Sequence, residues 1–183
     1  MIVALVVIGI VVLIAIFLVF RYNSLVRARN RVDQAWSQID VQLRQRYDLI
    51  PNLVETVKGY AAHERQTLEE VVAARQHGVE ATGVAEQAGA ENEITQALGR
   101  LFALSEAYPD LKANTNFLNL QEQLSGVEGK IAYARQFYND SVFGYNTRIQ
   151  SFPTNALASM FNFGEREYFE AEGEARGPVR VQF

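Results

Sequence analysis

The chain has 183 residues, 49% of them hydrophobic, which is enough for one domain with a hydrophobic core and leaves a segment over. Its formal charge of -4 argues against binding to nucleic acid, because contacts to phosphates need a basic surface. The chain contains no cysteine, which excludes disulfides, thiolate nucleophiles, thiol-bound zinc and iron–sulfur clusters.

The first segment is an unbroken run of apolar and small residues, Ile2 to Phe20. As a helix it spans roughly 28 Å, which matches the hydrocarbon core of a bilayer. A cleavable signal peptide is the alternative, but the run is long, no Lys or Arg precedes it, and no small-residue cleavage site comes before Arg21. We therefore predict a single-pass anchor over residues 1–22 that contacts the lipid bilayer through residues 2–20.

The run is followed by basic residues before the first acid, Asp33. These are Arg21, Arg27, Arg29 and Arg31. The positive-inside rule then places the soluble domain in the cytoplasm and the N-terminus outside. The alternative is that these arginines are solvated side chains of a helix that extend to the headgroups, which needs no orientation rule. A periplasmic domain then remains as the alternative.

Helical spacing of apolar residues continues from Leu25 through Ile39 and Leu43, so we expect a helix that leaves the membrane and enters a soluble domain at residues 23–163. Pro51 has no N–H and restricts Ile50, which predicts a break or kink within Tyr47 to Pro51 and a second helix from Pro51 to about Gly78. The glycines between His77 and Ala90 indicate a variable connection, and a third helix is expected from Ile94 to Leu104.

The fourth segment has the clearest pattern, an apolar stripe in alternating steps of three and four. Its members are Phe117, Leu120, Leu124, Val127, Ile131, Ala134, Tyr138, Val142, Tyr145 and Ile149. Burial in the core of the same chain is the favoured interpretation, and assembly between subunits as a coiled coil is the alternative.

On this segment Tyr138-Asn139 and Tyr145-Asn146 repeat one heptad apart, so the asparagines either bond neighbouring structure or point to solvent. Beyond it, Thr154 to Phe163 is expected to form a short amphipathic turn. The remainder, residues 164–183, is predicted to be a flexible acidic tail, and its last five residues alternate weakly like a strand.

Sequence motifs for catalysis and metal binding are missing. Neither His63 nor His77 has the partner spacing of a di-iron or zinc-protease helix, and there is no nucleophile elbow or phosphate-binding glycine loop. We therefore predict no catalytic, cofactor-binding or metal-binding residues, no cofactor and no enzyme activity. Charges within the apolar stretches are interpreted as a solvated face rather than a buried network, and a polar pocket around Asp40, Arg44 and Glu128 ranks last.

Two stretches resemble the LemA family over nearly the whole chain. The first runs from Ala35 through Leu43 and on from Arg46 to Tyr60, and the second comprises Glu128, Lys130 to Asp140, Tyr145-Asn146-Thr147 and Phe152-Pro153. The resemblance implies a bacterial inner-membrane protein with one membrane helix and an antiparallel helical bundle of about four long helices, an all-α fold. Members have poorly defined functions, and some are associated with membrane organelles or encoded beside membrane proteases.

From these features we predict a membrane-anchored structural or scaffolding protein that self-associates as a homo-oligomer through its helical domain. The alternative is an adaptor for a membrane protease or another membrane partner, with the acidic tail as its contact. An enzyme or ligand carrier that uses the Asp40, Arg44 and Glu128 pocket is the least favoured hypothesis.

Overall fold

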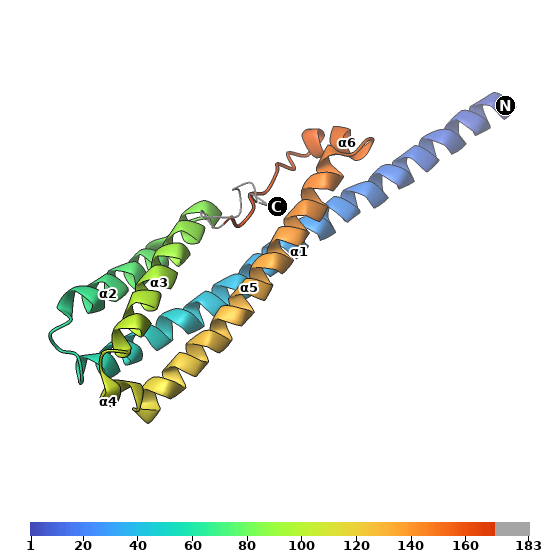
Figure 1. The fold of residues 1–183 in the computed structure, drawn as a ribbon. Helices are drawn as coiled ribbons and strands as arrows, with labels where there is room; N and C mark the ends of the chain where they lie inside the picture. The colour runs from blue at the N-terminus through green and yellow to red at the C-terminus, as the bar shows by residue number, and fades with distance from the viewer. Residues whose placement is uncertain (171–183) are drawn as a thin grey trace, which may run out of the picture. The chain divides into compact units, whose positions relative to one another are not determined.

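The computed structural model describes residues 1–170, which form six helices and no strand (Figure 1). The helices are α1 (Ile2–Lys58), α2 (Arg65–Glu80), α3 (Val84–Ser105), α4 (Pro109–Lys112), α5 (Thr115–Gln150) and α6 (Thr154–Met160). This confirms the predicted all-α class, with bundle-like packing of long helices and an apolar helix at the N-terminus.

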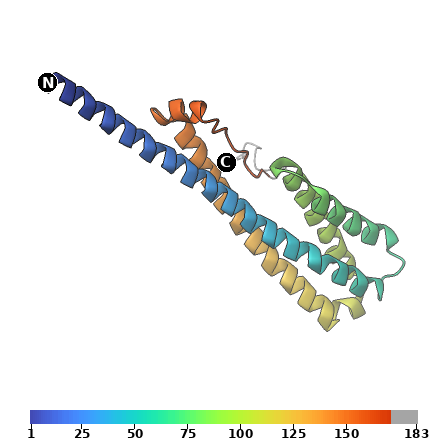
Figure 2. The same cartoon turned by 180° about the vertical axis from the view of Figure 1, so that it is seen from behind.

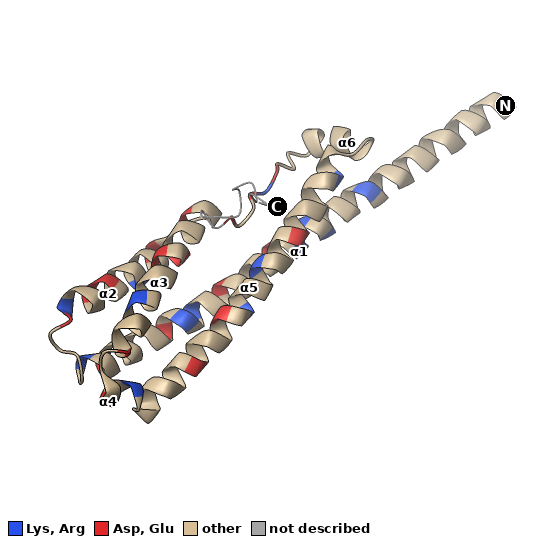
Figure 3. Ribbon diagram, in the orientation of Figure 1, with Lys and Arg blue, Asp and Glu red and all other residues tan. Residues whose placement is uncertain are grey.

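The apolar run Ile2 to Phe20 forms the first part of α1 and is exposed along its whole length. Figure 3 shows that no Lys, Arg, Asp or Glu interrupts it. A core helix of a soluble protein would bury such a surface, because exposed apolar area of this size is unfavourable in water. The chain is thus a membrane protein whose candidate membrane span continues into a longer helix.

The chain divides into two compact units, and α1 and α5 contribute residues to both. Unit 1 contains residues 1–40 and 133–167, and unit 2 contains residues 41–132 and 168–170. Each unit is described separately below.

In unit 1 the two long helices run antiparallel (Figure 2). The ring of Trp36 lies 5.5 Å from that of Tyr138, and Tyr22, earlier in α1, meets Phe161 beyond the end of α5 at 5.0 Å. The buried apolar side chains between them are Leu25, Ala28, Val32, Ala35 and Ile39 from α1 and Ala134, Tyr138, Val142, Tyr145 and Ile149 from α5.

An extended segment after α6, residues 164–167, is hydrogen-bonded to α5. Tyr145 Oη donates to the Gly164 carbonyl at 3.0 Å, and Tyr138 Oη donates to that of Glu167 at 2.9 Å. Asn146 Nδ2 donates to the Arg166 carbonyl at 2.9 Å, and its Oδ1 accepts from the Arg166 N–H at 3.0 Å. The Tyr145-Asn146 pair thus binds neighbouring backbone, one of the two alternatives left open by the sequence.

Residues 171–183 lie outside the described part of the chain. They include most of the segment expected to be a flexible tail and all of its strand-like end, and both expectations stay predictions there. The short amphipathic element expected over Thr154 to Phe163 corresponds to α6.

In unit 2, α2 packs along α3, and the two are joined by residues 81–83. The expected variable connection over His77 to Ala90 is wrong, because α2 continues past Gly78 and α3 begins at Val84. Gly78 is a helical residue at a place where α1 and α3 approach α2 too closely for a side chain. A Cβ at this position would lie 2.8 Å from Tyr47 Oη and 2.8 Å from Ile94 Cδ1. The turn itself needs Gly83, whose φ is +98°.

The apolar stripe of α5 is buried in the chain, apart from half-buried Leu120. Its first five members belong to unit 2 and the others to unit 1; the five are Phe117, Leu120, Leu124, Val127 and Ile131. The structure thus confirms the interpretation of this stripe as core. The stripe therefore offers no free surface for a coiled coil with a second copy.

Of the predicted break or kink within Tyr47 to Pro51, the break is wrong, and so is a new helix beginning at Pro51, because α1 continues through Pro51 to Lys58. A kink at this place stays a prediction. A proline at this position cannot donate to the carbonyl of the residue four positions earlier, Tyr47. Instead Arg75 Nε of α2 donates to that carbonyl at 2.8 Å. The Tyr47 carbonyl, which Pro51 leaves without an intrahelical donor, is thus hydrogen-bonded by the neighbouring helix. Helix α1 therefore continues and ends only at Lys58.

This arrangement predicts a coupling between Arg75 and Pro51. Replacing Arg75 by Met should destabilise the protein by about 1–3 kcal/mol, because the carbonyl of Tyr47 is left without a donor. In a Pro51→Ala background the restored N–H can donate to the same carbonyl, so the cost of Arg75→Met should be smaller. Denaturant unfolding of the four variants in mild detergent, followed by circular dichroism, measures both costs; equal costs in the two backgrounds would contradict the coupling.

Candidate functional site

The interior of unit 2 contains a connected polar cluster, which we call the Tyr47 cluster. It consists of Arg46 and Tyr47 from α1, Gln87, Glu91 and Thr95 from α3, and Glu128 from α5. Gln87, Glu91 and Thr95 are spaced four residues apart, so they lie on the same face of α3. That face meets the polar side chains of α1.

An ion pair forms the centre of the Tyr47 cluster. Arg46 Nη1 lies 2.8 Å from Glu91 Oε2, and the two side chains are only 3% and 1% exposed. Arg46 Nη2 also donates to Thr95 Oγ1 at 3.0 Å and lies 3.0 Å from a carboxylate oxygen of the half-buried Glu128. One guanidinium therefore joins three helices, α1, α3 and α5.

The other oxygen of Glu91 accepts a hydrogen bond from the hydroxyl of Tyr47. Gln87 Nε2 donates to Tyr47 Oη at 2.7 Å and to the carbonyl of Gly78 at 3.2 Å, which adds α2 to the network. Burial raises the pKa of the Tyr47 hydroxyl above its ordinary value, and the bond to Glu91 raises it further. The hydroxyl therefore keeps its proton at neutral pH and acts as a donor.

The contacts of the Tyr47 cluster are those of a structural cluster that holds helices together. Its carboxylate, guanidinium and phenol each pair with other members of the cluster, and Arg46 Nε is the buried atom of the guanidinium that has no hydrogen-bond partner among the described residues. A buried charge pair costs desolvation energy, which the short contacts and hydrogen bonds between Arg46, Glu91 and Tyr47 offset. The cluster fixes the register of α3 against α1.

This cluster was not predicted from the sequence, where the internal charges were interpreted as a solvated face and Gln87 and Glu91 did not stand out. That interpretation is wrong for Arg46. Of the three residues of the predicted polar pocket, Arg44 is exposed and Glu128 pairs with Arg46. The polar residues at four-residue spacing on α3 were the available signal.

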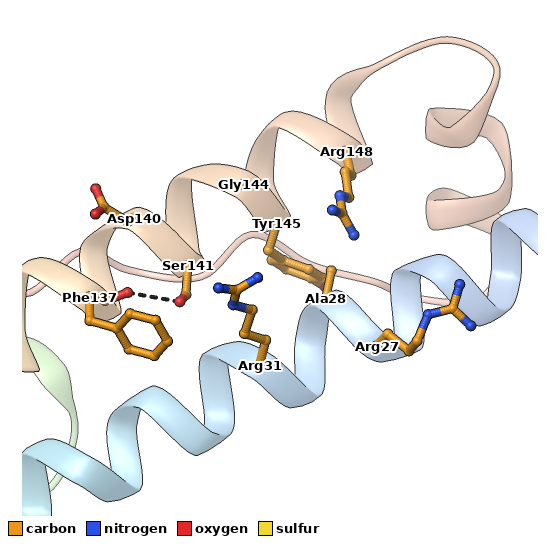
Figure 4. A pocket seen from close by; sticks show the side chains of 9 residues that line it. All are labelled: Arg27, Ala28, Arg31, Phe137, Asp140, Ser141, Gly144, Tyr145 and Arg148. Carbon is orange, nitrogen blue, oxygen red and sulfur yellow. Dashed lines mark hydrogen bonds between the residues drawn. The ribbon is translucent and has the colours of Figure 1, made fainter.

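A second feature, in unit 1, is a hollow of about 460 Å³ that we call the cationic groove (Figure 4). Its charged lining comprises Arg27 and Arg31 from α1 and Arg148 and Asp140 from α5. Arg31 and Arg148 extend into it from opposite helices, and the guanidinium of Arg31 lies 5.5 Å from the ring of Phe137. Three guanidiniums against one carboxylate favour an anionic group, because guanidinium binds phosphate and carboxylate oxygens in pairs.

A third feature, in unit 2, is an open hollow of about 910 Å³ along α1 and α2, which we call the apolar groove. Its apolar residues are Val54, Ala62, Leu68, Val72 and Ala73. Charges of both signs line its rim, with Glu55 and Glu69 against Lys58 and Arg65. Such a surface suits contact with another helical protein surface better than a small polar ligand.

Among residues 1–170, no three His, Asp or Glu side chains gather in a way that could hold a metal ion. His77, for example, pairs with Glu93 at 2.9 Å on the exposed faces of α2 and α3.

Comparison with known proteins finds a match between residues 35–183 and the sequence profile of the LemA family. A magnetosome protein, MamQ 2, from Paramagnetospirillum magneticum is 28% identical over 88% of this chain and 69% of its own length. MamQ from Magnetospirillum gryphiswaldense is 27% identical with the same coverage. Protein LemA from Metamycoplasma hominis is 28% identical over 82% of this chain and 69% of its own length.

The Tyr47 cluster predicts a large difference between two carboxylates that both pair with arginine. Glu91→Ala should destabilise the protein by about 3–5 kcal/mol, because it leaves the buried charge of Arg46 without its main partner. The control is Glu70→Ala, since Glu70 of α2 pairs with Arg100 of α3 at 3.0 Å on the surface of the same unit. That change should cost about 0–1 kcal/mol. Denaturant unfolding in detergent measures both, and similar costs would show that the cluster does not stabilise the fold.

Proposed function

Because the chain belongs to the LemA family, we propose that it is a membrane-anchored structural protein that self-associates through its helical domain and has no catalytic activity. The observation that carries self-association is the apolar groove of unit 2, where Val72 and Ala73 of α2 are exposed. The α5 stripe cannot serve this purpose, because its side chains are already packed within the chain.

The rim of the apolar groove supports a second copy as its occupant. In a two-fold symmetric dimer the same surface meets itself, so each acid of one copy must face a base of the other. The groove carries Glu55 and Glu69 together with Lys58 and Arg65, which allows this pairing. A partner of strongly acidic or basic character would meet like charges on the same rim.

Assembly at a membrane surface is the role that fits these features. The anchor restricts copies of the protein to two dimensions, which raises their effective concentration and strengthens a modest contact. The relatives named as magnetosome proteins are consistent with a role at a membrane-bounded structure. For this chain we place the anchor in the bacterial inner membrane.

Self-association through the apolar groove predicts different effects for two valines of α2. Val72 lines the groove and is 50% exposed, whereas Val79 is outside its lining and 52% exposed. Val72→Glu should lower the mass of the detergent-solubilised protein toward that of a monomer, because it puts a charge into the contact. Val79→Glu should leave the mass unchanged. Light scattering corrected for bound detergent measures this.

Two results would contradict the groove as the contact: an assembly that survives Val72→Glu, or equal losses with both variants. A wild-type protein that is monomeric at every concentration in detergent and in vesicles would remove self-association and favour the alternative, an adaptor for a membrane protease or another membrane partner.

The basic residues that follow the anchor support a cytoplasmic domain with the N-terminus outside. Since the chain has no cysteine, Tyr133→Cys on the exposed surface of α5 gives a unique thiol. A membrane-impermeant maleimide should label this thiol only after the membrane of spheroplasts is opened. Labelling of intact spheroplasts would support the periplasmic alternative.

A further inference from the structure

Helix α6 places uncovered apolar side chains beside the end of the anchor. A hollow of about 520 Å³ lies between α1 and α6, lined from α1 by Leu18, Val19 and Tyr22 and from α6 by Leu157 and Met160, with Phe161 after it. The rings of Tyr22 and Phe161 meet edge to face with centroids 5.0 Å apart, and Phe163 adds a second edge-to-face contact to Tyr22 at 5.8 Å. All these residues belong to unit 1.

The depth of α6 follows from its neighbours. Leu18 and Val19 lie one to two residues before the end of the apolar run at Phe20, so at helical rise they are within about 3 Å of the edge of the hydrocarbon core when the run spans a bilayer. Side chains that pack laterally against these two residues are therefore at the boundary between acyl chains and headgroups.

The composition of the segment fits that depth. No ionisable residue occurs from Ile149 to Gly164, and Figure 3 shows no charge on α6. Met160 is 72% exposed, Phe152 is more exposed still, and Phe161 is half-exposed, all within this uncharged segment. Aromatic side chains and sulfur-containing apolar chains gain free energy by leaving water for such an interface.

The uncharged segment is followed by the acid Glu165 and preceded by basic residues. Arg148 is the last charged residue before the segment, and it lines the cationic groove with Arg27 and Arg31. Arg27 is seven residues beyond Phe20, about 10 Å along the helix, so its side chain can reach the phosphate level of the same leaflet. The side chains are thus apolar at α6 and mostly cationic at the cationic groove. This order matches that of the bilayer, where acyl chains are followed by anionic headgroups.

From this geometry we infer that α6, with Phe152, Met160 and Phe161, inserts into the bilayer interface beside the protein's own anchor and forms a second membrane contact. The occupant of the α6 surface is lipid, because this surface continues the lipid-facing surface of the anchor. The inference rests on the membrane anchoring in the proposed function, and it adds a lateral contact that holds unit 1 against the membrane.

Single cysteines in the otherwise cysteine-free full-length chain test this inference. The variants Met160→Cys and Phe152→Cys are labelled with an environment-sensitive fluorophore in reconstituted vesicles. Leu13→Cys reports on the anchor. The matched control is Phe143→Cys, an exposed aromatic position of unit 1 that is 64% exposed and lies on α5 outside the uncharged segment. Quenchers attached to lipid and quenchers dissolved in water are then compared at each position.

Labels at Met160 and Phe152 should be quenched by lipid-borne quenchers near the headgroup boundary and protected from the water-soluble quencher, whereas the Phe143 label should show the reverse. The inference would be overturned if the labels at positions 160 and 152 were as accessible to water as the label at position 143 while the label at position 13 lay in the bilayer. The membrane anchor would still stand. Protection from both quenchers would identify protein as the occupant and also overturn the inference. A Leu13 label in water would mean that the anchoring itself fails.

Discussion

Tyr47 is the residue on which the packing of unit 2 depends. Its backbone carbonyl, left without a helical donor by Pro51, binds Arg75 of α2, and its hydroxyl binds Glu91 and Gln87 of α3. A single residue of α1 therefore holds both helices of the α2–α3 pair through groups that would be costly to bury alone. The close approach of Gly78 to the same hydroxyl shows how little space this arrangement leaves.

Much of the fold was predictable from the apolar pattern. The anchor follows from the length of its unbroken apolar run, and the buried stripe of α5 and the all-α class follow from hydrophobic periodicity, which reports burial. The end of α1 could not be predicted in this way. The rule that proline ends a helix assumes that no distant group will donate to the carbonyl that the proline leaves without a partner. Arg75 lies far along the chain, and its role depends on tertiary packing that local patterns do not contain.

The Tyr47 cluster was unpredictable for a related reason. Glu91 and Arg46 have the same sequence signature as surface charges, and only their joint burial distinguishes them from pairs such as Glu70 and Arg100. The cationic and apolar grooves are likewise made by residues whose meeting depends on helix packing. Helical periodicity identifies which face is buried, but it does not tell which polar residues accompany that face into the core.

The contact between α6 and the last turn of the apolar run affects how the protein can be studied in shortened form. A fragment that begins at Arg21 loses Leu18 and Val19, and the apolar side of α6 then faces water with its native neighbours removed. Such fragments would adhere to one another through the apolar side chains that line a common hollow with Leu18 and Val19 in the intact chain. Their mass in solution would overstate native assembly, so subunit number has to be measured with the anchor present.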